Sequence, residues 1–575
     1  MTHVQLTTPY DNIPVDLHGP NMKDYDEVKE NFTFIIPESF NYGFDVIDRW
    51  AEDRTKLAMV WASRDLHDIR KYSFFDLKCL SNKFANVLRR KGIKKGDRVF
   101  VMIPRIVEWY AVMLGSAKLG VVPIPASSIL VPHDVEYRVQ QSKAAAAVMW
   151  HENTSKIDDV RSHCPTLKEF ICIGGQHEGW DDYAALMDEA SAKLSRDDVE
   201  ATKSDDALLI FFTSGTTKLP KMVCHTHASY GIGHIITAKF WQDLKPTDLH
   251  WTLSDTGWAK AGWGKIYGQW QIGAAVMVHD AAARFDAAAH LKIIEKCGVT
   301  TFCAPPTAYR MLILEDLSQF DLTGLRHSLA AGEPLNPEII KVWEKHTGTT
   351  IYDGYGQTES VCMIANYPCM EIKFGSMGKP APGFDIQVVN DDGDPVPTNE
   401  EGHIAVRVKP KAPLGLFTEY LHNQEATDEA FIGDWYFTGD KATVDKDGYF
   451  WFVGRADDVI KASGYRVGPF EVESALQSHP AVAESAVVGS PDELRGTIVK
   501  AFIVLAPGFK PSDGLIKEIQ NHVKKETAPY KYPRKIEFLP ELPKTISGKI
   551  RRVELRKKEE AKAAAEFRNS VTTNR

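Results

Sequence analysis

Short apolar runs alternate with amphipathic stretches along much of the chain. Between the runs, hydrophobic residues recur with helical spacing, as in Tyr72–Lys91 and Asp286–Lys296. This alternation predicts an α/β fold with largely parallel sheets. The apolar runs predict β-strands at Arg98–Ile103, Ala145–Met149, Glu169–Ile173, Ala207–Phe212, Ala274–Val278 and Thr300–Ala304.

The pattern changes twice further along the chain. From about residue 375 to 453, short strands are separated by turns rich in Gly, Pro and Asp, which predicts a small antiparallel sheet or barrel. After Arg455, helical stretches at Glu471–Gln477 and Leu515–Glu526 accompany strand-like runs, as in a small α+β unit. We therefore predict a large N-terminal domain, residues 1–455, and a small C-terminal domain, residues 456–575.

Composition narrows the class of protein. Of the 575 residues, 43% are hydrophobic and 25% are charged, as in a soluble globular protein. The net charge of −9 argues against a general nucleic-acid binder. This charge is uneven, because the chain from Asp457 onward is net basic and the rest is net acidic. The eight cysteines form no CxxC pair, so we expect reduced thiols.

No segment has the pattern of a targeting signal or a membrane span. The first residues show neither a basic stretch before an apolar run nor the Arg-rich, acid-free composition of a transit peptide. The most apolar long stretch, Tyr110–Val131, is interrupted by Lys118, Pro123 and Pro125. We therefore expect a cytoplasmic protein without stable membrane insertion.

A loop rich in hydroxyl groups follows the predicted strand Ala207–Phe212. Its hydroxyls, glycine and lysines suit the binding of phosphate oxygens. The glycine spacing is not that of a P-loop, and no GxGxxG follows a strand, so a Rossmann dinucleotide site is not supported. The loop consists of Thr213, Ser214, Gly215, Thr216, Thr217, Lys218, Leu219, Pro220 and Lys221.

Four more segments carry related chemistry. A flat ring could lie against the small residues around Tyr355, and Glu359 offers a hard oxygen ligand for Mg²⁺. Asp440 could accept hydrogen bonds from ribose hydroxyls, and Lys549, in a Gly/Ser turn, could reach a phosphate. The segments are Ala331–Leu335, Tyr352–Glu359, Trp435–Asp440 with Gly454–Asp458, and Pro543–Lys549.

These motifs together resemble the adenylate-forming superfamily of acyl-CoA synthetases, non-ribosomal adenylation domains and beetle luciferases. The resemblance covers about residues 42–554 and is strongest to medium-chain acyl-CoA synthetases, through segments such as Leu253–Trp258 and Ala528–Phe538. It implies an N-terminal domain of two αβ-layered subdomains with parallel sheets plus a small β-barrel. It also implies that the small α+β C-terminal domain is mobile.

The resemblance also implies how ATP is held. The Thr213–Lys221 loop would close over the β- and γ-phosphates, Tyr355 would stack on adenine, and Thr358 would contact the α-phosphate. Glu359 and Thr217 would hold Mg²⁺, and Lys549 would bridge the α-phosphate and the carboxylate; Lys549, Thr358 and Glu359 are thus the implied catalytic residues. The remaining ATP-site residues would be Gly332, Glu333, Pro334, Asp353, Gly354, Gly356, Gln357, Asp440 and Arg455.

A second step would use another orientation of the C-terminal domain. In the family this domain rotates about a hinge, which Asp457 matches, so that Lys549 leaves and the Lys461–Gly468 loop arrives. The implied CoA contacts are Ser463, Gly464, Tyr465, Arg466, Arg495, Tyr532, Pro533 and Arg534.

The acyl pocket decides the substrate. Acetate-specific relatives carry Trp where this chain has Gly356, and each additional buried CH₂ stabilises binding by roughly 0.8 kcal/mol, so we expect a longer acid. The expected pocket residues are Trp258, Ala259, Lys260, Gly332, Gly354 and Gly356. We expect Lys260 to extend outward from this apolar site, with a role as a cap for shorter or branched acids as the alternative. We interpret Trp263 and Trp270 as core residues and give His225 and His227 no catalytic role.

The sequence therefore predicts ATP-dependent ligation of a medium-chain acid, which could be branched or aromatic, to CoA. The acid, ATP and CoA would be its partners, Mg²⁺ its metal, and the protein a monomer or homodimer. The main alternative is an adenylation enzyme that loads a carrier protein, although no carrier domain follows Lys549. A luciferase-like oxygenase and a catalytically silent binding protein are further alternatives.

Overall fold

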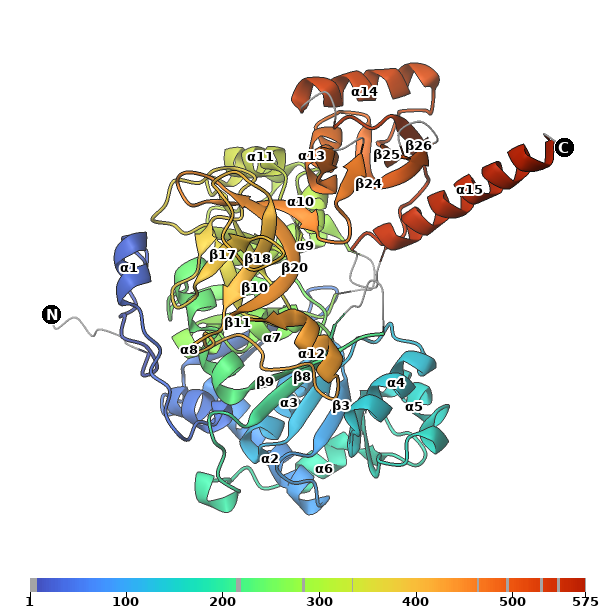
Figure 1. Cartoon of the computed structure of the whole chain (residues 1–575). Helices are drawn as coiled ribbons and strands as arrows, with labels where there is room; N and C mark the ends of the chain where they lie inside the picture. The colour runs from blue at the N-terminus through green and yellow to red at the C-terminus, as the bar shows by residue number, and fades with distance from the viewer. Residues whose placement is uncertain are drawn as a thin grey trace.

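The computed structural model describes most of the chain (Figure 1). Side chains are described as far as Lys562, without those of Lys461, Tyr465 and Arg466. The described ranges are 8–213, 219–281, 285–333, 335–462, 465–492, 496–527, 531–544 and 549–573.

The first α/β layer contains a parallel five-stranded sheet in the order β4-β3-β5-β6-β7. Its central strands are almost wholly buried, which explains their continuous apolar runs. The strands are β3 (Arg98–Met102), β4 (Val122–Pro125), β5 (Ala146–Trp150), β6 (Glu169–Ile173) and β7 (Asp181–Asp182). The helices are α2 (Phe74–Arg90), α3 (Val107–Leu119), α4 (Pro132–Ser142), α5 (Ser155–Asp158) and α6 (Tyr183–Glu189).

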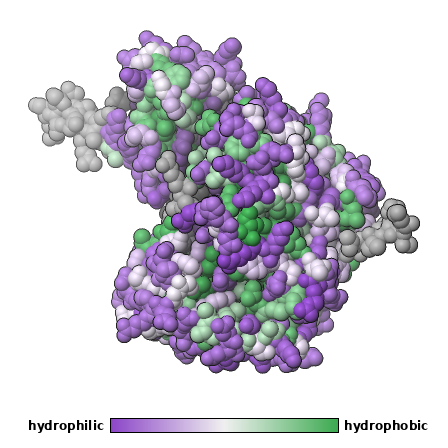
Figure 2. Space-filling view, turned by 180° about the vertical axis from the view of Figure 1, so that it is seen from behind, coloured by the Kyte–Doolittle hydropathy of each residue, from purple (hydrophilic) through white to green (hydrophobic). Residues whose placement is uncertain are grey.

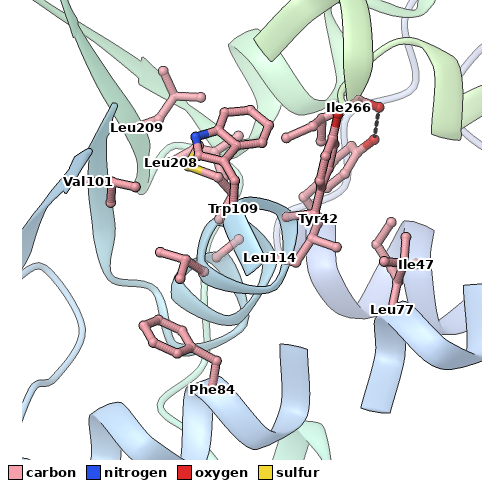
Figure 3. Packing of buried hydrophobic residues seen from close by; sticks show 14 of the residues in the cluster. Tyr42, Ile47, Leu77, Phe84, Val101, Trp109, Leu114, Leu208, Leu209 and Ile266 are labelled. Carbon is pink, nitrogen blue, oxygen red and sulfur yellow. Dashed lines mark hydrogen bonds between the residues drawn. The ribbon is translucent and has the colours of Figure 1, made fainter. Parts of the chain in front are cut away.

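Helix α3 lies at the centre of the hydrophobic core. Every residue from Trp109 to Leu119 is buried, so the helix is apolar on all sides rather than along one face. Figure 3 shows Trp109 and Leu114 packed between Phe84 of α2 and Leu208, and the Tyr42 hydroxyl donating to the Ile266 carbonyl at 2.7 Å. The core thus joins the N-terminal segment to both α/β layers.

The second α/β layer contains a nine-stranded sheet in the order β16-β15-β14-β13-β12-β10-β11-β1-β2. Strands β14 to β1 pair in parallel, and β15, β16 and β2 pair antiparallel at the edges. The strands are β1 (Leu57–Ala62), β2 (Ile69–Ser73), β10 (Leu249–Thr252), β11 (Ala275–His279), β12 (Thr301–Ala304), β13 (His327–Ala331), β14 (Ile351–Gly356), β15 (Cys362–Ala365) and β16 (Lys379–Pro380). The helices are α7 (Ala259–Lys265), α8 (Gln269–Ile272), α9 (Ala287–Cys297), α10 (Pro306–Leu312) and α11 (Pro337–Thr347).

Shorter elements connect the layers. The predicted strand Ala207–Phe212 is β8, which pairs antiparallel with β9 (Met222–Thr226) as a separate hairpin rather than joining a parallel sheet. The other short elements are α1 (Tyr25–Asn31), α12 (Gln424–Ala430), three π-helices (Gly43–Asp48, His227–Ile232 and Thr237–Trp241) and four 3₁₀ turns (His151–Asn153, Arg161–His163, Arg196–Asp198 and Leu317–Gln319).

The region expected to be a small barrel is an antiparallel sheet. Its order is β17-β18-β20-β19, with β21 also pairing with β20, so the pairing is that of an open sheet. The strands are β17 (Ile386–Val389), β18 (Gly402–Arg407), β19 (Phe431–Ile432), β20 (Trp435–Val444) and β21 (Phe450–Arg455).

The C-terminal unit has its own core and stands apart at the top of Figure 1. Strands β24 and β25 pair antiparallel and β25 and β26 in parallel, with helices α13 and α14 packed beside them. Figure 2, which views the whole molecule from behind, shows a largely hydrophilic surface with smaller hydrophobic areas. The elements are β22 (Ile460–Ala462), β23 (Tyr465–Val467), α13 (Pro469–Gln477), β24 (Val482–Asp492), β25 (Gly496–Leu505), α14 (Asp513–Glu526), β26 (Lys535–Phe538) and α15 (Arg552–Thr573).

Candidate active site

Asp440 is the centre of a hydrogen-bond network that joins two sheets. It lies on β20 directly opposite Arg455 of β21, whose guanidinium contacts Asp440 Oδ1 at 3.2 Å. Asp440 Oδ2 accepts hydrogen bonds from the Tyr355 hydroxyl and from Gln357 Nε2, both at 2.7 Å. The structure thus brings together four predicted ATP-site residues from distant segments. A carboxylate can accept about four hydrogen bonds, so Asp440 keeps capacity for sugar hydroxyls.

Gln357 is fixed at both ends of its amide. Its Nε2 also donates to the Thr438 carbonyl at 2.9 Å, and its Oε1 accepts from the Tyr436 hydroxyl at 2.9 Å. Tyr436 is a site residue that the sequence reasoning missed, although it lies inside the motif quoted around Asp440. Its position next to the buried Trp435 on β20 gives no local signal that its hydroxyl meets Gln357.

Glu359 is half-buried and lies against Tyr420. The Tyr420 hydroxyl donates to Glu359 Oε1 at 2.8 Å, and the Phe417 amide donates to the Glu359 carbonyl at 2.8 Å. Burial raises the pKa of Glu359, and the hydrogen bond from Tyr420 opposes that rise. Lys221 Nζ lies 4.3 Å from the centroid of the Tyr420 ring. Tyr420 was not predicted, yet it links the carboxylate expected to hold Mg²⁺ to the end of the phosphate loop.

His225 positions the backbone beside Glu359. Its Nε2 lies 2.7 Å from the Thr358 carbonyl, and burial lowers its pKa to about 4, so the ring is neutral near pH 7 and donates from Nε2. His227 is buried too, and its Nδ1 accepts from the Tyr42 amide at 3.2 Å. These contacts agree with the structural interpretation of both histidines.

The described ends of the phosphate loop lie side by side where β8 ends and β9 begins. The Thr213 amide donates to the Lys221 carbonyl at 2.9 Å, and the Lys221 amide donates to Thr213 Oγ1 at 3.0 Å. The Tyr137 hydroxyl donates to the Pro220 carbonyl at 3.0 Å, which ties the loop to α4. The predicted residues Ser214, Gly215, Thr216, Thr217 and Lys218 lie outside the described residues.

Lys260 points into the site, so the expectation that it extends outward is wrong. Its Nζ donates to the Ala331 carbonyl at 2.7 Å, at the end of β13. A Cβ on Gly332, where φ is +102°, would lie 3.1 Å from this Nζ. The carbonyl acceptor at the strand end supplies the polar partner that draws the ammonium group inward. Burial and the positive charge of Lys549 lower the pKa of Lys260.

Two predicted carboxylates lie near the expected adenine position. Asp353 on β14 is buried, and burial raises the pKa of its carboxyl to about 7. Glu333 accepts from the Thr307 hydroxyl at 2.8 Å and lies 3.5 Å from the Arg310 guanidinium. Both contacts come from α10, which fixes the loop after β13. Pro334 lies outside the described residues.

The pocket glycines face protein rather than open space. A Cβ on Gly354 would lie 2.4 Å from the Trp241 ring, and a Cβ on Gly356 would lie 2.5 Å from the Val361 carbonyl oxygen. Trp241 is fully buried, and its ring centroid lies 5.8 Å from that of Trp263. Gly354 therefore admits a buried indole from another element, which no local motif signals. At Gly356 a side chain would require the backbone of Val361 to shift, and the expectation that this glycine opens the pocket stays a prediction.

The N-terminus of α7 supplies the remaining expected pocket residues. Trp258 caps this helix and is half-buried, and the Ala259 carbonyl accepts from the Tyr230 hydroxyl at 3.2 Å. Trp263, one turn on, is half-buried and packs against Trp241, whereas Trp270 is fully buried. The interpretation as core therefore fits Trp270 better than Trp263.

The C-terminal unit presents Lys549 toward the site. Lys549 is exposed, and burial together with the positive charge of Lys549 lowers the pKa of Lys260, so the two side chains are close enough for their charges to interact. Arg552, at the start of α15, forms an ion pair with Glu473 at 2.6 Å. The negative charges of Glu473 and of Glu333 raise the pKa of Arg552. This orientation is the one expected for the first reaction step.

The expected CoA residues are described only in part. The Arg534 guanidinium contacts the Tyr532 hydroxyl at 3.0 Å, and Lys524 Nζ lies 4.2 Å from the Tyr532 ring centroid, so a cationic patch exists there. The Pro533 carbonyl accepts from Gln520 and the proline is buried, which removes it from direct contact. Tyr465 and Arg466 lie on β23 with undescribed side chains, and Ser463, Gly464 and Arg495 lie outside the described residues.

The predicted hinge residue, Asp457, contacts two arginines. The Asp457 carbonyl accepts from Arg556 at 2.6 Å, and its carboxylate lies 4.0 Å from Arg455 Nε.

Over the described residues, no group of three or more His, Cys, Asp or Glu side chains could hold a metal. A single carboxylate such as Glu359 fits Mg²⁺, which is commonly bound by one or two carboxylates together with substrate phosphates.

Comparisons with known proteins identify the family of this chain. The family model described as AMP-binding enzyme matches residues 47–421, and that of the AMP-binding enzyme C-terminal domain matches residues 471–549. Human acyl-coenzyme A synthetase ACSM3, mitochondrial, is 46% identical over 549 residues, which cover 94% of this chain and 93% of that protein.

Solved structures show the same fold. The anthranilate CoA ligase AuaEII in complex with anthranoyl-AMP has a TM-score of 0.84 and 33% identity, covering 92% of this chain and 99% of that chain. A benzoate CoA ligase from Burkholderia xenovorans LB400 has a TM-score of 0.79 and 27% identity, covering 90% of this chain and 100% of that chain.

The chain belongs to the AMP-binding enzyme family. The predicted resemblance and the predicted fold class, a large α/β N-terminal part with a small C-terminal domain, are both confirmed. None of the helices in the described part of the chain is long and apolar enough to cross a bilayer.

Proposed function

We propose that this protein is an AMP-forming acyl-CoA ligase. It joins a carboxylic acid to ATP to give an acyl-adenylate and pyrophosphate, and then transfers the acyl group to CoA with release of AMP. The prediction of acyl-adenylate-forming CoA ligation is confirmed by the family match and by the relatives, and the carrier-protein alternative has less support. Enzymes of this family use ATP, CoA and Mg²⁺.

The observation that carries the proposal is the network at Asp440. In addition, the positive charge of Lys549 acts on Lys260. Asp440 and Arg455 hold the ribose, and Tyr355 supplies the flat surface for adenine. When the carboxylate attacks the α-phosphorus, negative charge accumulates between Lys260 and Lys549, whose charges stabilise it. A carboxylate is already deprotonated, so no general base is needed.

Glu359, oriented by Tyr420, would hold the metal ion. Bound Mg²⁺ supplies positive charge that neutralises the phosphate oxygens as pyrophosphate leaves. Lys221 is held close to Glu359 through the Tyr420 ring and would contact the same phosphates. Thr217, the other residue we assign to the metal, would approach from the phosphate loop.

The substrate is a medium-chain or aromatic acid rather than acetate. The residues around Gly354 and Gly356 are apolar or sulfur-containing, with Trp241, Cys303 and Cys362 packed in one cluster. Such a surface favours an apolar acyl group, because each buried CH₂ contributes roughly 0.8 kcal/mol. The solved relatives that act on anthranilate and benzoate show that this fold also admits flat aromatic acids.

One experiment tests both the activity and its two steps. Purified protein is incubated with ATP, Mg²⁺, CoA and acids from acetate to decanoate with benzoate, and AMP and thioester are measured. Lys549→Ala should abolish acyl-adenylate formation while sparing thioester formation from supplied acyl-AMP. Absence of AMP release with every acid would contradict the proposal, and equal loss of both steps would contradict the role of Lys549.

Acceptor, location and assembly complete the proposal. CoA should be a far better acceptor than a phosphopantetheinyl carrier protein, and no light should be emitted.

We propose a cytoplasmic location and a monomer or homodimer. The human relative carries the word mitochondrial in its name, so fractionation of cells expressing the native chain decides between the two compartments. Light scattering of the purified protein gives the oligomeric state.

A further inference from the structure

A cavity of about 340 Å³ lies at one end of the five-stranded sheet, away from the reaction site. It is lined by the residues that follow β3 (Ile106 to Glu108), by Trp150 at the end of β5 and by Gly174 after β6. The chain runs from β3 to β4 on one side and then to β5 on the other, so the strand order reverses there. Ligands of open α/β sheets bind in this crevice, at the carboxyl ends of the strands.

The walls of the cavity are aromatic and held in place. They consist of Trp61, Tyr72, Trp150 and Tyr183. Trp61 Nε1 donates to the Arg105 carbonyl at 3.0 Å. Trp150 lies flush against the backbone of the residue after β6, where a Cβ would come within 2.3 Å of its ring and where φ is +85°. The walls are therefore preformed.

The cavity also contains a carboxylate, Glu108, that feels the charge of Arg70 but forms no ion pair with it. Glu108, in the first turn of α3, is half-buried, and no ion pair within 4.0 Å is formed by it in the described part of the chain. Arg70 lies at the rim, where it pairs with Asp68 at 2.5 Å and stacks over Trp61. The Tyr183 hydroxyl is buried and has no hydrogen-bond partner among the described residues.

We propose that this cavity binds a small organic cation, an ammonium group on an apolar body, with the ammonium at Glu108 and the body between the aromatic rings. Aromatic faces attract cations, most strongly where the cation is desolvated. A carboxylate without a partner in an apolar pocket gains most from a positive ligand. An anion is disfavoured, because Glu108 and Asp182 both line the cavity and the single guanidinium is already paired.

Calorimetry on the full chain tests the charge of the ligand. The probes are 2-phenylethylammonium, the neutral 2-phenylethanol and the anionic 2-phenylethanesulfonate, which share one apolar body. We expect the ammonium compound to bind at least about tenfold more tightly than the alcohol, as expected for a charge-assisted contact, and the sulfonate more weakly still. Equal affinities, or tighter binding of the sulfonate, would overturn the proposal.

Matched variants test the location. Glu108→Gln should weaken binding of 2-phenylethylammonium about tenfold or more, whereas Glu152→Gln, an exposed carboxylate two residues after Trp150, should leave it unchanged. Both variants should keep the pyrophosphate-exchange activity of the parent. Trp150→Leu removes one wall, should also weaken binding, and keeps the test open if the Glu108 variant fails to fold. Unchanged affinity in the Glu108 or Trp150 variant places the probe elsewhere and refutes the site.

Discussion

At the scale of single residues, the reaction site depends on polar side chains that position other polar side chains. Asp440 is contacted by three donors, and Glu359 by the Tyr420 hydroxyl, before any ligand is present. Groups oriented in this way need little reorganisation when charge develops during the reaction. Tyr420 is the clearest case, because one side chain contacts both a carboxylate and a lysine expected at the phosphates.

Tyr420→Phe should therefore lower adenylation while leaving the fold intact. The variant keeps the ring under Lys221 but loses the hydroxyl that orients Glu359. Loss of such an outer contact typically costs about 10–100-fold in metal affinity or activity. We expect the Mg²⁺ concentration for half-maximal pyrophosphate exchange to rise in that range, with binding of Mg²⁺–ATP measured directly by calorimetry.

The matched control is Tyr449→Phe, which removes a hydroxyl donating to the Glu371 carbonyl at 2.5 Å. Neither Tyr449 nor Glu371 belongs to the proposed site. This variant should keep the parental Mg²⁺ dependence. If Tyr420→Phe lowered only thermal stability and left the Mg²⁺ dependence unchanged, the positioning role of Tyr420 would be wrong.

At the scale of elements, β14 is the strand on which most of the site is built. It pairs in parallel with β13 on one side and antiparallel with β15 on the other, with a register shift between Tyr355 and Gly356. Residues of this one strand lie in different surroundings. Tyr355 reaches Asp440, while Asp353 is buried beneath the site.

The buried Asp353 should make stability fall as pH rises. Its pKa is raised to about 7, whereas an unperturbed aspartate titrates at about 3.9. Between these values the folded state binds the proton more tightly, so the free energy of unfolding decreases with rising pH. Asp353→Asn keeps the size and an acceptor oxygen but does not titrate. It should match the parent near pH 4 and be more stable above pH 7 by up to a few kcal/mol.

Urea midpoints measured from pH 4 to 8 check this difference. Asp392→Asn, in an exposed turn between β17 and β18, is the control and should reproduce the parental profile. Parallel profiles for Asp353→Asn and the parent would show that Asp353 is ionised in both the folded and the unfolded protein, contrary to the prediction.

The glycine at the end of β14 gives a third prediction. A side chain on Gly356 would meet the Val361 carbonyl oxygen at 2.5 Å, so the backbone leaves no room for an indole. Overpacking of this kind costs typically 1–3 kcal/mol. We expect Gly356→Trp to lower the melting temperature and the activity with every acid. A clean change to acetate at unchanged stability would instead support the simpler interpretation from the sequence.

The sequence predicted the elements of this site better than their contacts. Strands such as Thr300–Ala304 and helices such as Asp286–Lys296 follow from local periodicity, which acts over a few residues and is visible in one segment. The link from Tyr420 to Glu359, the indole of Trp241 against Gly354 and the inward direction of Lys260 depend on residues that meet only in the folded chain. No local pattern encodes these contacts, and the direction of Lys260 in helix α7 was predicted wrongly because its acceptor lies on a distant strand, β13.

At the scale of the whole molecule, an acidic body and a basic C-terminal unit meet over one site. The body holds Asp440 and Glu359, and the C-terminal unit brings Lys549 and the cationic patch around Tyr532. The positive charge of Lys549 acts on Lys260 in this structure, which suits adenylation. Thioester formation needs the Lys461–Gly468 segment there instead, so the chain between Arg455 and Ile460 must change conformation.

Asp457→Pro should separate the two reaction steps by stiffening this connection. The Asp457 amide donates no hydrogen bond to the backbone within the described residues, so proline removes no such contact, but it fixes φ and restricts Ala456 as well. Because the charge of Lys549 already acts on Lys260, we expect pyrophosphate exchange to stay within about threefold of the parent. Thioester formation from supplied acyl-AMP should fall about a hundredfold or more, corresponding to at least about 2.7 kcal/mol. Asp457→Ala, which leaves φ free, is the control and should retain both steps. Loss of adenylation with retention of thioester formation would mean that the rigid connection favours the other orientation, and the assignment of the two conformations would be reversed.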